Sequence, residues 1–312
     1  MTATVFIDGA VGTTGLEIAD RLAGRAEFDL IVLDDERRKD ADARREALNE
    51  ADFAILCLPD DAAREAVALI DPASGTRVID ASTAHRVATG WTYGFPELVG
   101  RAVVAKADRV SNPGCYSTGF IALLAPLVRA GLLPADWPYT CNAVSGYSGG
   151  GKSLIARFEQ DLDIAWRGYA LGLGHKHVPE MQAQCGLSVA PLFAPAVVPA
   201  HRGMVVEIPL PISAIAGASS PDALRDALAA FYDGSKIVRM GRDPEDGEML
   251  LRGSREPSDA MDLFVFASTD GSQARLVAVL DNLGKGASGA AVQSLNLMAG
   301  LDEAAGLRLP NL

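Results

Sequence analysis

The N-terminal segment restricts the fold more than any other part of the chain. Residues 4–8 form an apolar, strand-like run that leads directly into G-A-V-G-T-T-G at residues 9–15. Leu16, Ala19 and Leu22 then follow helical spacing. The order strand, glycine turn, helix is that of a nucleotide-binding βαβ unit, because glycines let the backbone approach a pyrophosphate and the helix N-terminus supplies N–H donors. The spacing G-x-x-G-x-x-G differs from the commoner G-x-G-x-x-G, so other segments must support this interpretation.

The segments that follow support it. Strand-like runs at residues 29–33, 52–58 and 76–80 alternate with helical segments such as residues 61–70. This alternation predicts a parallel, doubly wound sheet of the Rossmann type, that is, an α/β fold. The second run ends at Asp34, about 20 residues after the glycine turn, where a residue that reads the cofactor ribose is expected.

The charges after Asp34 bear on which nicotinamide cofactor binds. Arg37, Arg38 and Lys39 come within five residues of it, and an arginine can pair bidentately with a ribose 2′-phosphate. They favour NADP over NAD, although an ordinary solvated run of charges remains an alternative. The predicted cofactor contacts are Gly9, Gly12, Thr13, Thr14, Gly15, Arg37, Arg38, Leu58, Pro59 and Ser82.

From about residue 140 the pattern changes to strand signals. Residues 203–210, 263–267 and 274–280 read as strands, and a turn at 269–272 joins the last two, which predicts a largely antiparallel sheet in an α+β domain. A last helix, residues 287–298, is expected to return to the first domain. The predicted domains are residues 1–114 with the C-terminal helix, about 286–312, for the cofactor, and 115–285 for catalysis, substrate binding and oligomerisation.

Composition narrows the class of partner. The 312-residue chain carries 28 Lys and Arg against 40 Asp and Glu, a net charge of −12, so it should repel nucleic acid and anionic lipid, and a small-molecule substrate is expected. The sequence has no apolar run of about 18 residues and no signal-peptide pattern at its start, which indicates a cytoplasmic protein. Its four cysteines lack a C-x-x-C pair, so we expect reduced thiols, no structural zinc and no metal site.

Cys115 is the candidate nucleophile. It lies in S-N-P-G-C-Y-S-T-G, residues 111–119, where a strand-like run ends and an amphipathic helix with one buried face is expected through residues 120–128. A sulfur at a helix N-terminus faces unpaired N–H groups and the positive end of the helix dipole, and both favour the nucleophilic thiolate. The alternative is a small buried hydrophobic residue, the usual fate of a free cysteine.

Residues 146–153, G-Y-S-G-G-G-K-S, match the phosphate-loop pattern G-x-x-x-x-G-K-S after a strand-like run at 139–144. A nucleotide hydrolase also needs a metal-binding carboxylate at the end of a later apolar strand, and no such strand precedes the antiparallel region. We therefore interpret the loop as a general anion cradle, with the hydrolase as an alternative.

Two further groups carry polar chemistry. His175 and His177 project to opposite faces if their segment is extended, which suits one general acid/base better than a shared metal, and a purely structural histidine is the alternative. Arg202 is a candidate clamp for a substrate carboxylate, with surface solvation as the alternative.

These motifs together resemble a known family. The quoted runs are G-A-V-G-T-T-G at 9–15, N-P-G-C-Y-S-T at 112–118, S-G-Y-S-G at 145–149, H-K-H-V-P-E at 175–180 and D-N-L-G-K-G-A-S-G at 281–289. They are similar to the N-acetyl-γ-glutamyl-phosphate reductase family, most of all to its shorter, type 2 variant, within the aspartate-semialdehyde dehydrogenase-like superfamily. The similarity spans nearly the whole chain, and G-G-K at 150–152 is its main departure from the family pattern.

The resemblance implies NADPH-dependent reduction of N-acetylglutamyl 5-phosphate to the 5-semialdehyde, with release of phosphate, in arginine biosynthesis, by a homodimer or homotetramer. It implies that Cys115 forms a thioester and that His177, with His175 second, moves the proton. Residues assigned to the substrate are Asn112, Ser145, Gly146, Ser148, Gly149, Lys152 and Arg202. Alternatives are the same chemistry on aspartyl or aminoadipyl phosphate, the nucleotide hydrolase, and a non-catalytic NADP-binding sensor.

Overall fold

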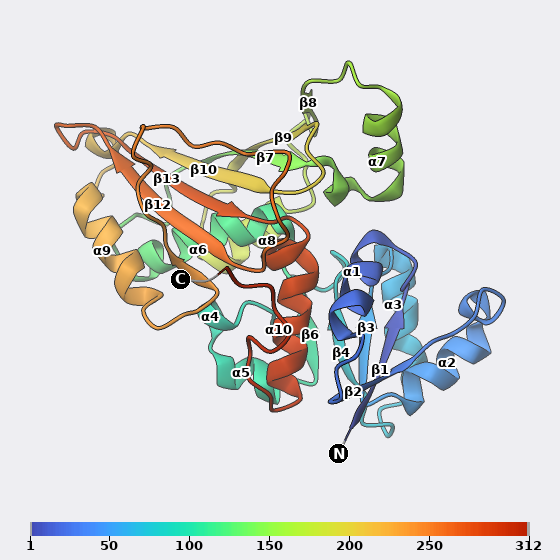
Figure 1. Ribbon diagram of the computed structural model, residues 1–312. Coiled ribbons are helices and arrows are strands. Elements are labelled where there is room, and N and C mark those ends of the chain that lie inside the picture. Colours follow the sequence, from blue (N-terminus) through green and yellow to red (C-terminus); the bar gives the residue numbers. More distant parts are fainter. Residues whose placement is uncertain (1, 311–312) are drawn as a thin grey trace. The chain divides into compact units, whose positions relative to one another are not determined.

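The computed structural model describes residues 2–310 as two compact units, each presented by itself (Figure 1). Of the described residues, the first unit holds 2–114 and 287–307, and the second holds 115–286 with the segment that begins at Arg308. The sequence assigned that last segment to the first unit. In the structure the Arg308 N–H donates to Asp259 Oδ2 at 2.8 Å and the Asp259 N–H donates to the Arg308 carbonyl at 2.8 Å, which ties it to the second.

The first unit contains a six-stranded sheet in the order β2-β1-β3-β4-β6-β5, with every neighbouring pair parallel. This confirms the parallel sheet expected from the alternating strand and helix signals. Its strands are β1 (Ala3–Asp8), β2 (Phe28–Ile31), β3 (Phe53–Leu56), β4 (Arg77–Asp80), β5 (Thr92–Tyr93) and β6 (Arg109–Ser111). Its helices are α1 (Thr13–Leu22), the 3₁₀ turn η1 (Arg37–Lys39), α2 (Ala41–Glu50), α3 (Asp60–Leu69), α4 (Pro96–Val99), α5 (Arg101–Lys106) and α10 (Gly289–Met298).

Period-two alternation along β1 supplies both faces of this sheet with apolar side chains. Val5 and Ile7 belong to one buried cluster, together with residues of α1 and α10, and Phe6 belongs to a second cluster with residues of α2. Since α10 contributes Val292 and Leu295 to the first cluster, the chain's last helix returns to the first unit, as the sequence predicted.

The second unit contains a seven-stranded mixed sheet in the order β11-β12-β13-β10-β7-β9-β8. Most neighbours are antiparallel, as expected, while β7 with β9 and β11 with β12 pair in parallel. Its strands are β7 (Thr140–Gly146), β8 (Arg167–Gly168), β9 (Leu192–Val198), β10 (Met204–Leu210), β11 (Val238–Met240), β12 (Met261–Ala267) and β13 (Ala274–Leu280). Its helices and turns are α6 (Cys115–Arg129), η2 (Tyr147–Gly150), α7 (Gly151–Gln160), α8 (Val178–Cys185), η3 (Ile212–Ala214), α9 (Pro221–Phe231) and the π-helical turn η4 (Gly284–Ser288), which leads into α10.

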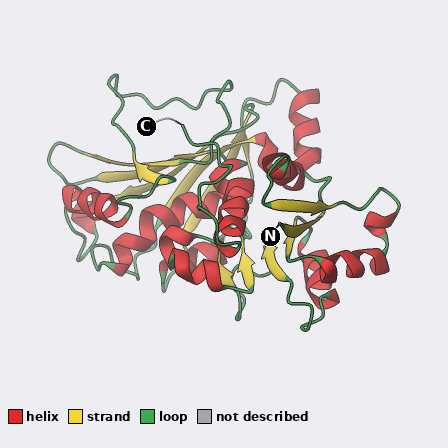
Figure 2. Cartoon of the chain, turned by 60° about the horizontal axis from the view of Figure 1, so that its bottom comes forward, coloured by secondary structure: helices red, strands yellow, loops and turns green. Residues whose placement is uncertain are grey.

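Helices α6, α8 and α9 gather on one face of this sheet (Figures 1 and 2). Helix α6 was expected to bury one face, and that expectation is wrong: residues 116–127 are buried without exception. The physical reason is that β10 and β13 cover one side of α6 while α8 and α9 cover others. Gly119 permits the close approach, because a Cβ there would lie 2.8 Å from a Val206 methyl carbon.

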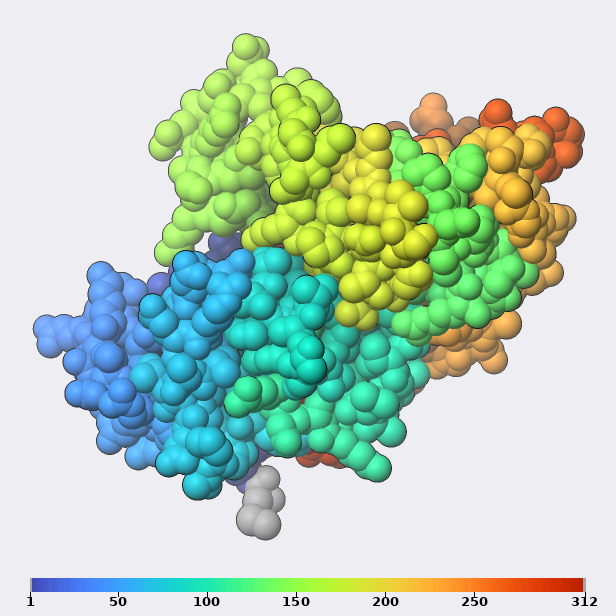
Figure 3. All heavy atoms as spheres, turned by 180° about the vertical axis from the view of Figure 1, so that it is seen from behind, coloured from blue at the N-terminus to red at the C-terminus, as the bar shows by residue number. Residues whose placement is uncertain are grey.

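The segment with α7 and β8 stands out from the rest of the second unit (Figure 3). Leu162, Trp166 and Leu171 on this segment are exposed. Of the helices described, none combines the length and apolar character needed to cross a membrane.

Candidate active site

The predicted cofactor residues lie at one edge of the parallel sheet. Gly9, Gly12, Thr13, Thr14 and Gly15 form the turn after β1 and the start of α1, Arg37 and Arg38 form η1 after β2, Leu58 and Pro59 follow β3, and Ser82 follows β4. The carboxyl ends of parallel strands share one edge, so the first unit brings these residues to the edge where such sheets bind nucleotides.

The glycine turn is built for close approach of backbone. Gly9 has a φ of +87°, and a Cβ on it would lie 2.4 Å from the Cys57 carbonyl oxygen. A Cβ on Gly15 would lie 2.5 Å from the Gly9 carbonyl oxygen. Gly12 precedes α1 and provides no side-chain cap, so the first N–H groups of α1 are suited to a phosphate. The turn therefore fits a dinucleotide pyrophosphate.

The basic residues after β2 already have acidic neighbours. Arg37 pairs with Glu46 at 2.8 Å and Arg38 with Asp35 at 2.7 Å, and these pairs are largely exposed. Asp34 Oδ1 accepts the N–H groups of Glu36 and Arg37 and so shapes the turn. Exposed ion pairs contribute little free energy, so either arginine can exchange its partner for a 2′-phosphate at small cost.

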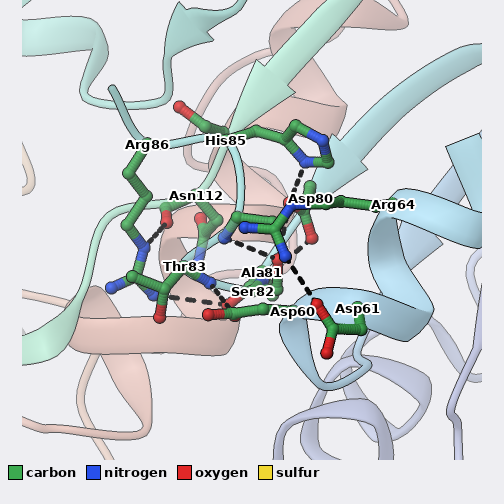
Figure 4. A network of polar contacts seen from close by, with 12 residues as sticks. Asp60, Asp61, Arg64, Asp80, Ala81, Ser82, Thr83, His85, Arg86 and Asn112 are labelled. Atoms are coloured by element: carbon green, nitrogen blue, oxygen red, sulfur yellow. Dashed lines mark hydrogen bonds and ion pairs between the residues drawn. The ribbon is translucent and has the colours of Figure 1, made fainter. Parts of the chain in front are cut away.

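Ser82 belongs to a buried polar network after β4 (Figure 4). Asp80 is fully buried and accepts hydrogen bonds from the Ser82 N–H at 2.9 Å, the Ser82 hydroxyl at 2.7 Å and His85 Nδ1 at 2.6 Å. The Thr83 N–H donates to Asp60 Oδ1 at 2.8 Å, which ties this loop to the start of α3. The network holds the loop's backbone in place, and the Ser82 hydroxyl is committed to Asp80.

Asn112 directly follows β6. Its Nδ2 donates to the Ala287 carbonyl at 2.9 Å, and its own carbonyl accepts from Arg86 Nε at 3.0 Å. Asn112 Oδ1 is buried and has no hydrogen-bond partner among the residues described. Since buried polar atoms are nearly always satisfied, this oxygen is suited to a donor from a bound ligand.

Cys115 is the first residue of α6 in the second unit, as the sequence predicted. It is partly exposed, whereas residues 116–127 of the helix are buried. The backbone of Gly286, in η4, lies against it: a Cβ on Gly286 would be 2.9 Å from the Cys115 Cβ. The thiol is thus held at a helix N-terminus, a position that favours a negatively charged sulfur.

The two histidines lie in a turn that leads into α8. The extended conformation considered for this segment is wrong, and the ring centroids of His175 and His177 are 4.7 Å apart. The His177 N–H donates to His175 Nδ1 at 3.1 Å, and His175 Nε2 lies 3.2 Å from the Tyr169 hydroxyl. Because Nδ1 accepts a hydrogen bond, neutral His175 carries its proton on Nε2 and donates it to Tyr169.

Tyr116 joins the start of α6 to both histidines. Its ring centroid lies 6.1 Å from that of His175 and 6.0 Å from that of His177, and its hydroxyl donates to the Ala196 carbonyl at 2.9 Å. Burial raises the pKa of Tyr116 well above its ordinary value, so this phenol stays neutral and acts as a fixed wall of the site.

The predicted anion loop is η2 with the start of α7. The N–H groups of Gly146, Tyr147 and Ser148 donate to the carbonyl oxygens of three residues in the 200–203 turn. Those donors are engaged by backbone and do not form a phosphate nest, which is why the match to G-x-x-x-x-G-K-S misleads. Lys152 is exposed on the first turn of α7.

Arg202 is neither solvated nor isolated. Its guanidinium lies 3.1 Å from Asp281 Oδ2, and Asp281 is fully buried. Asn282 Nδ2 donates to Ser148 Oγ at 2.9 Å, and its Oδ1 accepts the Gly203 N–H at 2.9 Å. The second unit therefore brings the loop of Ser148 and the turn of Arg202 together around residues 281–282, while Ser145 Oγ bonds within its own segment, to the Gly146 carbonyl.

Several residues around the site were not identified from the sequence as functional. They are Tyr116, Tyr169, Glu180, Asp281, Asn282 and Lys285. Position within the quoted motifs is the signal that was available for all of these except Tyr169, which no motif covers. Among the described residues, no group of three or more His, Cys, Asp and Glu side chains is arranged to hold a metal ion.

Comparison with known proteins gives consistent matches. Residues 4–107 match the family described as "Semialdehyde dehydrogenase, NAD binding domain", and residues 115–282 match "Semialdehyde dehydrogenase, dimerisation domain". The chain is 49% identical to N-acetyl-gamma-glutamyl-phosphate reductase of Trichormus variabilis, covering 97% of this chain and 98% of that protein. It is 47% identical to the enzyme of the same name from Rhizobium meliloti, covering 96% and 99%.

Solved structures resemble the fold at lower identity. Aspartate semialdehyde dehydrogenase II of Vibrio cholerae, complexed with ASA, aligns with a TM-score of 0.70 at 17% identity over 96% of this chain and 99% of that one. Aspartate semialdehyde dehydrogenase of Francisella tularensis aligns with a TM-score of 0.70 at 12% identity, covering 95% and 100%. These matches support the α/β fold with its two kinds of sheet.

Proposed function

The chain belongs to the N-acetyl-γ-glutamyl-phosphate reductase family, and we infer that it reduces N-acetyl-L-glutamyl 5-phosphate to N-acetyl-L-glutamate 5-semialdehyde, releasing phosphate, in arginine biosynthesis. It is an NADP-dependent oxidoreductase. The observation that carries the inference lies in the second unit. Cys115 is the first residue of α6, and His175 and His177 lie just before α8. The ring of Tyr116 lies close to both histidine rings.

The residues of the first unit fit the cofactor. The glycines allow a tight turn that a Cβ would block, α1 begins without a side-chain cap, and the ion pairs of Arg37 and Arg38 are largely exposed. We assign the pyrophosphate to the start of α1 and the 2′-phosphate to the two arginines. When bound, NADPH supplies the hydride that reduces the substrate carbonyl.

Cys115 is the proposed nucleophile. Its thiolate attacks the acyl carbon of the phosphorylated substrate, the carbon–oxygen bond to phosphate breaks, and a thioester forms on sulfur. The thioester is a better hydride acceptor than a carboxylate. After reduction, the sulfur leaves again as the aldehyde is released.

His177 is the proposed acid and base, with His175 holding it in place. His175 has both ring nitrogens engaged, one by the His177 N–H and one by Tyr169, so its proton is committed to a structural bond. The ring of His177 lies close to the ring of Tyr116, which belongs to the first turn of α6. We therefore assign to His177 the proton that moves as the thiohemiacetal forms and collapses.

The substrate-side residues are proposals of the same kind. Asn112 Oδ1 is a buried acceptor that can take a hydrogen bond from a substrate donor. The guanidinium of Arg202 is paired with the carboxylate of Asp281. Ser145, Gly146, Ser148, Gly149 and Lys152 are assigned to the neighbourhood of the phosphate. Exposed Lys152 adds positive charge there without belonging to a phosphate nest.

The decisive assay runs the reverse reaction with N-acetylglutamate 5-semialdehyde, NADP and phosphate. Cys115→Ser is expected to lose at least about a thousandfold in rate, because the covalent route is removed. Cys185→Ser is the matched control, since Cys185 is buried within α8. Mass spectrometry of enzyme with acyl phosphate and no reductant should find the acyl group on the peptide that contains Tyr116, and substantial turnover by Cys115→Ser would refute the mechanism.

The chain is also expected to form homo-oligomers, and we propose a homodimer or a homotetramer. Phe193 and Val206 face α6, so the alternate residues of β9 and β10 point to the sheet face opposite the helices. Leu192 and Pro209 are exposed there. Light scattering gives the subunit number, and Leu192→Asp should lower the mass if this face joins subunits.

We propose a cytoplasmic location. None of the four cysteines, all of which the structure describes, is in a disulfide, and a reducing compartment would keep the Cys115 thiol active. Fluorescence microscopy of a tagged chain tests the location.

A further inference from the structure

A buried hydrogen bond joins the first turns of α6 and α8. The Ser117 hydroxyl donates to Glu180 Oε2 at 2.8 Å, and the two residues are 0% and 1% exposed. Ser117 follows Cys115 by two residues, and Glu180 follows His177 by three. A carboxylate at this depth is costly unless hydrogen bonds and charges compensate it, so apolar packing alone does not account for Glu180.

We propose that Glu180 and Ser117 are positioning residues that fix the distance and orientation between the Cys115 sulfur and the His177 ring. The proposal rests on the proposed function. Each member lies within one helical turn of a catalytic candidate, because the separations are two and three residues and a turn of α-helix holds about 3.6 residues. A displacement at this bond would therefore move Cys115 and His177 relative to each other by a similar distance.

A carboxylate suits this place for two reasons. Glu180 lies in the first turn of α8, where the positive end of the helix dipole stabilises negative charge. A hydrogen bond to a charged acceptor is also stronger and more directional than one between neutral groups. Tyr116 supplies a second tie, through its ring contacts with both histidines, but ring packing leaves more freedom to slide than a short hydrogen bond does.

The same helix offers a matched control. The Tyr232 hydroxyl donates to the Ala122 carbonyl of α6 at 2.8 Å, and it too is buried. It anchors α6 to the region after α9 and takes no part in the active site. Tyr232→Phe removes one buried hydrogen bond from α6, as Ser117→Ala does, without loosening the tie to α8.

The test measures kcat, KM and thermal midpoint for Ser117→Ala, Glu180→Ala, the double variant and Tyr232→Phe in the reverse reaction. We expect the two single active-site variants to lose about 10- to 100-fold in kcat with KM changed by less than about threefold, since positioning acts on the reacting geometry. The double variant should be no slower than Glu180→Ala alone, because that variant already removes the bond to Ser117. Ser117→Thr, which keeps a hydroxyl, should restore most of kcat, and Tyr232→Phe should keep it.

Two results would overturn the proposal. One is that Ser117→Ala keeps kcat within about twofold while losing as much thermal stability as Tyr232→Phe, which would make the bond structural only. The other is that the losses in Ser117→Ala and Glu180→Ala multiply in the double variant. If Glu180→Ala does not fold, Ser117→Ala with its threonine rescue decides alone. Failure here leaves the Cys115→Ser result untouched, whereas turnover by Cys115→Ser would refute the proposed function itself.

Discussion

Gly286→Ala tests whether the turn after β13 sets the position of the thiol. The new Cβ would lie 2.9 Å from the Cys115 Cβ and 3.3 Å from its Cα, whereas ordinary contacts begin near 3.4 Å. Relief of the closer contact therefore needs a movement of about 0.5 Å. Neither atom is the end of a flexible side chain, so the start of α6 or the turn itself must move.

The turn is the stiffer partner. The Gly286 N–H donates to the Asp281 carbonyl at 3.0 Å, and the same Cβ would lie 3.1 Å from that oxygen. Asp281 is fully buried, accepts the Leu283 N–H at 2.9 Å and pairs with Arg202. We therefore expect Cys115 to be displaced. Overpacking costs about 1–3 kcal/mol and the better helix propensity of alanine returns up to about 1 kcal/mol, so the net loss of stability should lie between about 0 and 3 kcal/mol. A drop in kcat of about 10- to 100-fold should accompany it.

The assay combines reverse-reaction kinetics with a thermal melt. Gly253→Ala is the control, because a Cβ on Gly253 meets no atom within 4 Å, and it should change stability by less than about 0.5 kcal/mol and leave kcat intact. A folded Gly286→Ala variant with kcat within about twofold of the parent would refute the argument that backbone contact from this turn places the sulfur.

Three further predictions follow from charges and burial. At pH 8, iodoacetamide should label Cys115 alone, because burial raises the pKa of Cys57 to about 12 and also raises the pKa of Cys141 and Cys185, and peptide mapping checks this. Replacing Arg37 and Arg38 together by alanine should raise KM for NADPH about tenfold or more and leave KM for NADH unchanged, which steady-state kinetics with both cofactors would show. Burial raises the pKa of Tyr169 to about 12, whereas an unfolded tyrosine has a pKa of about 10. The neutral phenol therefore contributes about 2–3 kcal/mol to the free energy of unfolding below pH 10, and this contribution is lost as the pH rises from about 10 to 12. Denaturation of Tyr169→Phe across this pH range should lack that part of the loss.

The parallel sheet could be predicted because its signals are local. The strand before Gly9, the glycine spacing and the helical period after it lie within one short segment, and the structure forms β1, the turn and α1 there. The start of α6 at Cys115 was predictable for the same reason, since Pro113 and Gly114 end the preceding strand-like run. The roles of Cys115 and of the histidines remain predictions.

Contacts between distant segments were not predictable in this way. Ser117 looks like a polar residue on an exposed first turn, yet it is buried against Glu180, 63 residues away. Arg202 likewise reads as a free cation until it is placed beside Asp281, 79 residues away. Neither partner is identifiable from periodicity, because periodicity reports which face of an element is covered and not which residue covers it.

The phosphate-loop match shows why a motif needs its structural context. The chain does place G-Y-S-G-G-G-K-S between a strand and a helix, so both the letters and the local elements agree with a nucleotide hydrolase. What differs is the use of the N–H groups: those of Gly146, Tyr147 and Ser148 are engaged by carbonyls of the 200–203 turn, and Asn282 bonds the Ser148 hydroxyl. A phosphate nest requires N–H groups that point outward together. The same glycines therefore serve close packing here, because a Cβ on Gly146 would lie 2.7 Å from the Ala200 carbonyl oxygen, and the loop's contribution to catalysis must come from its side chains and its shape.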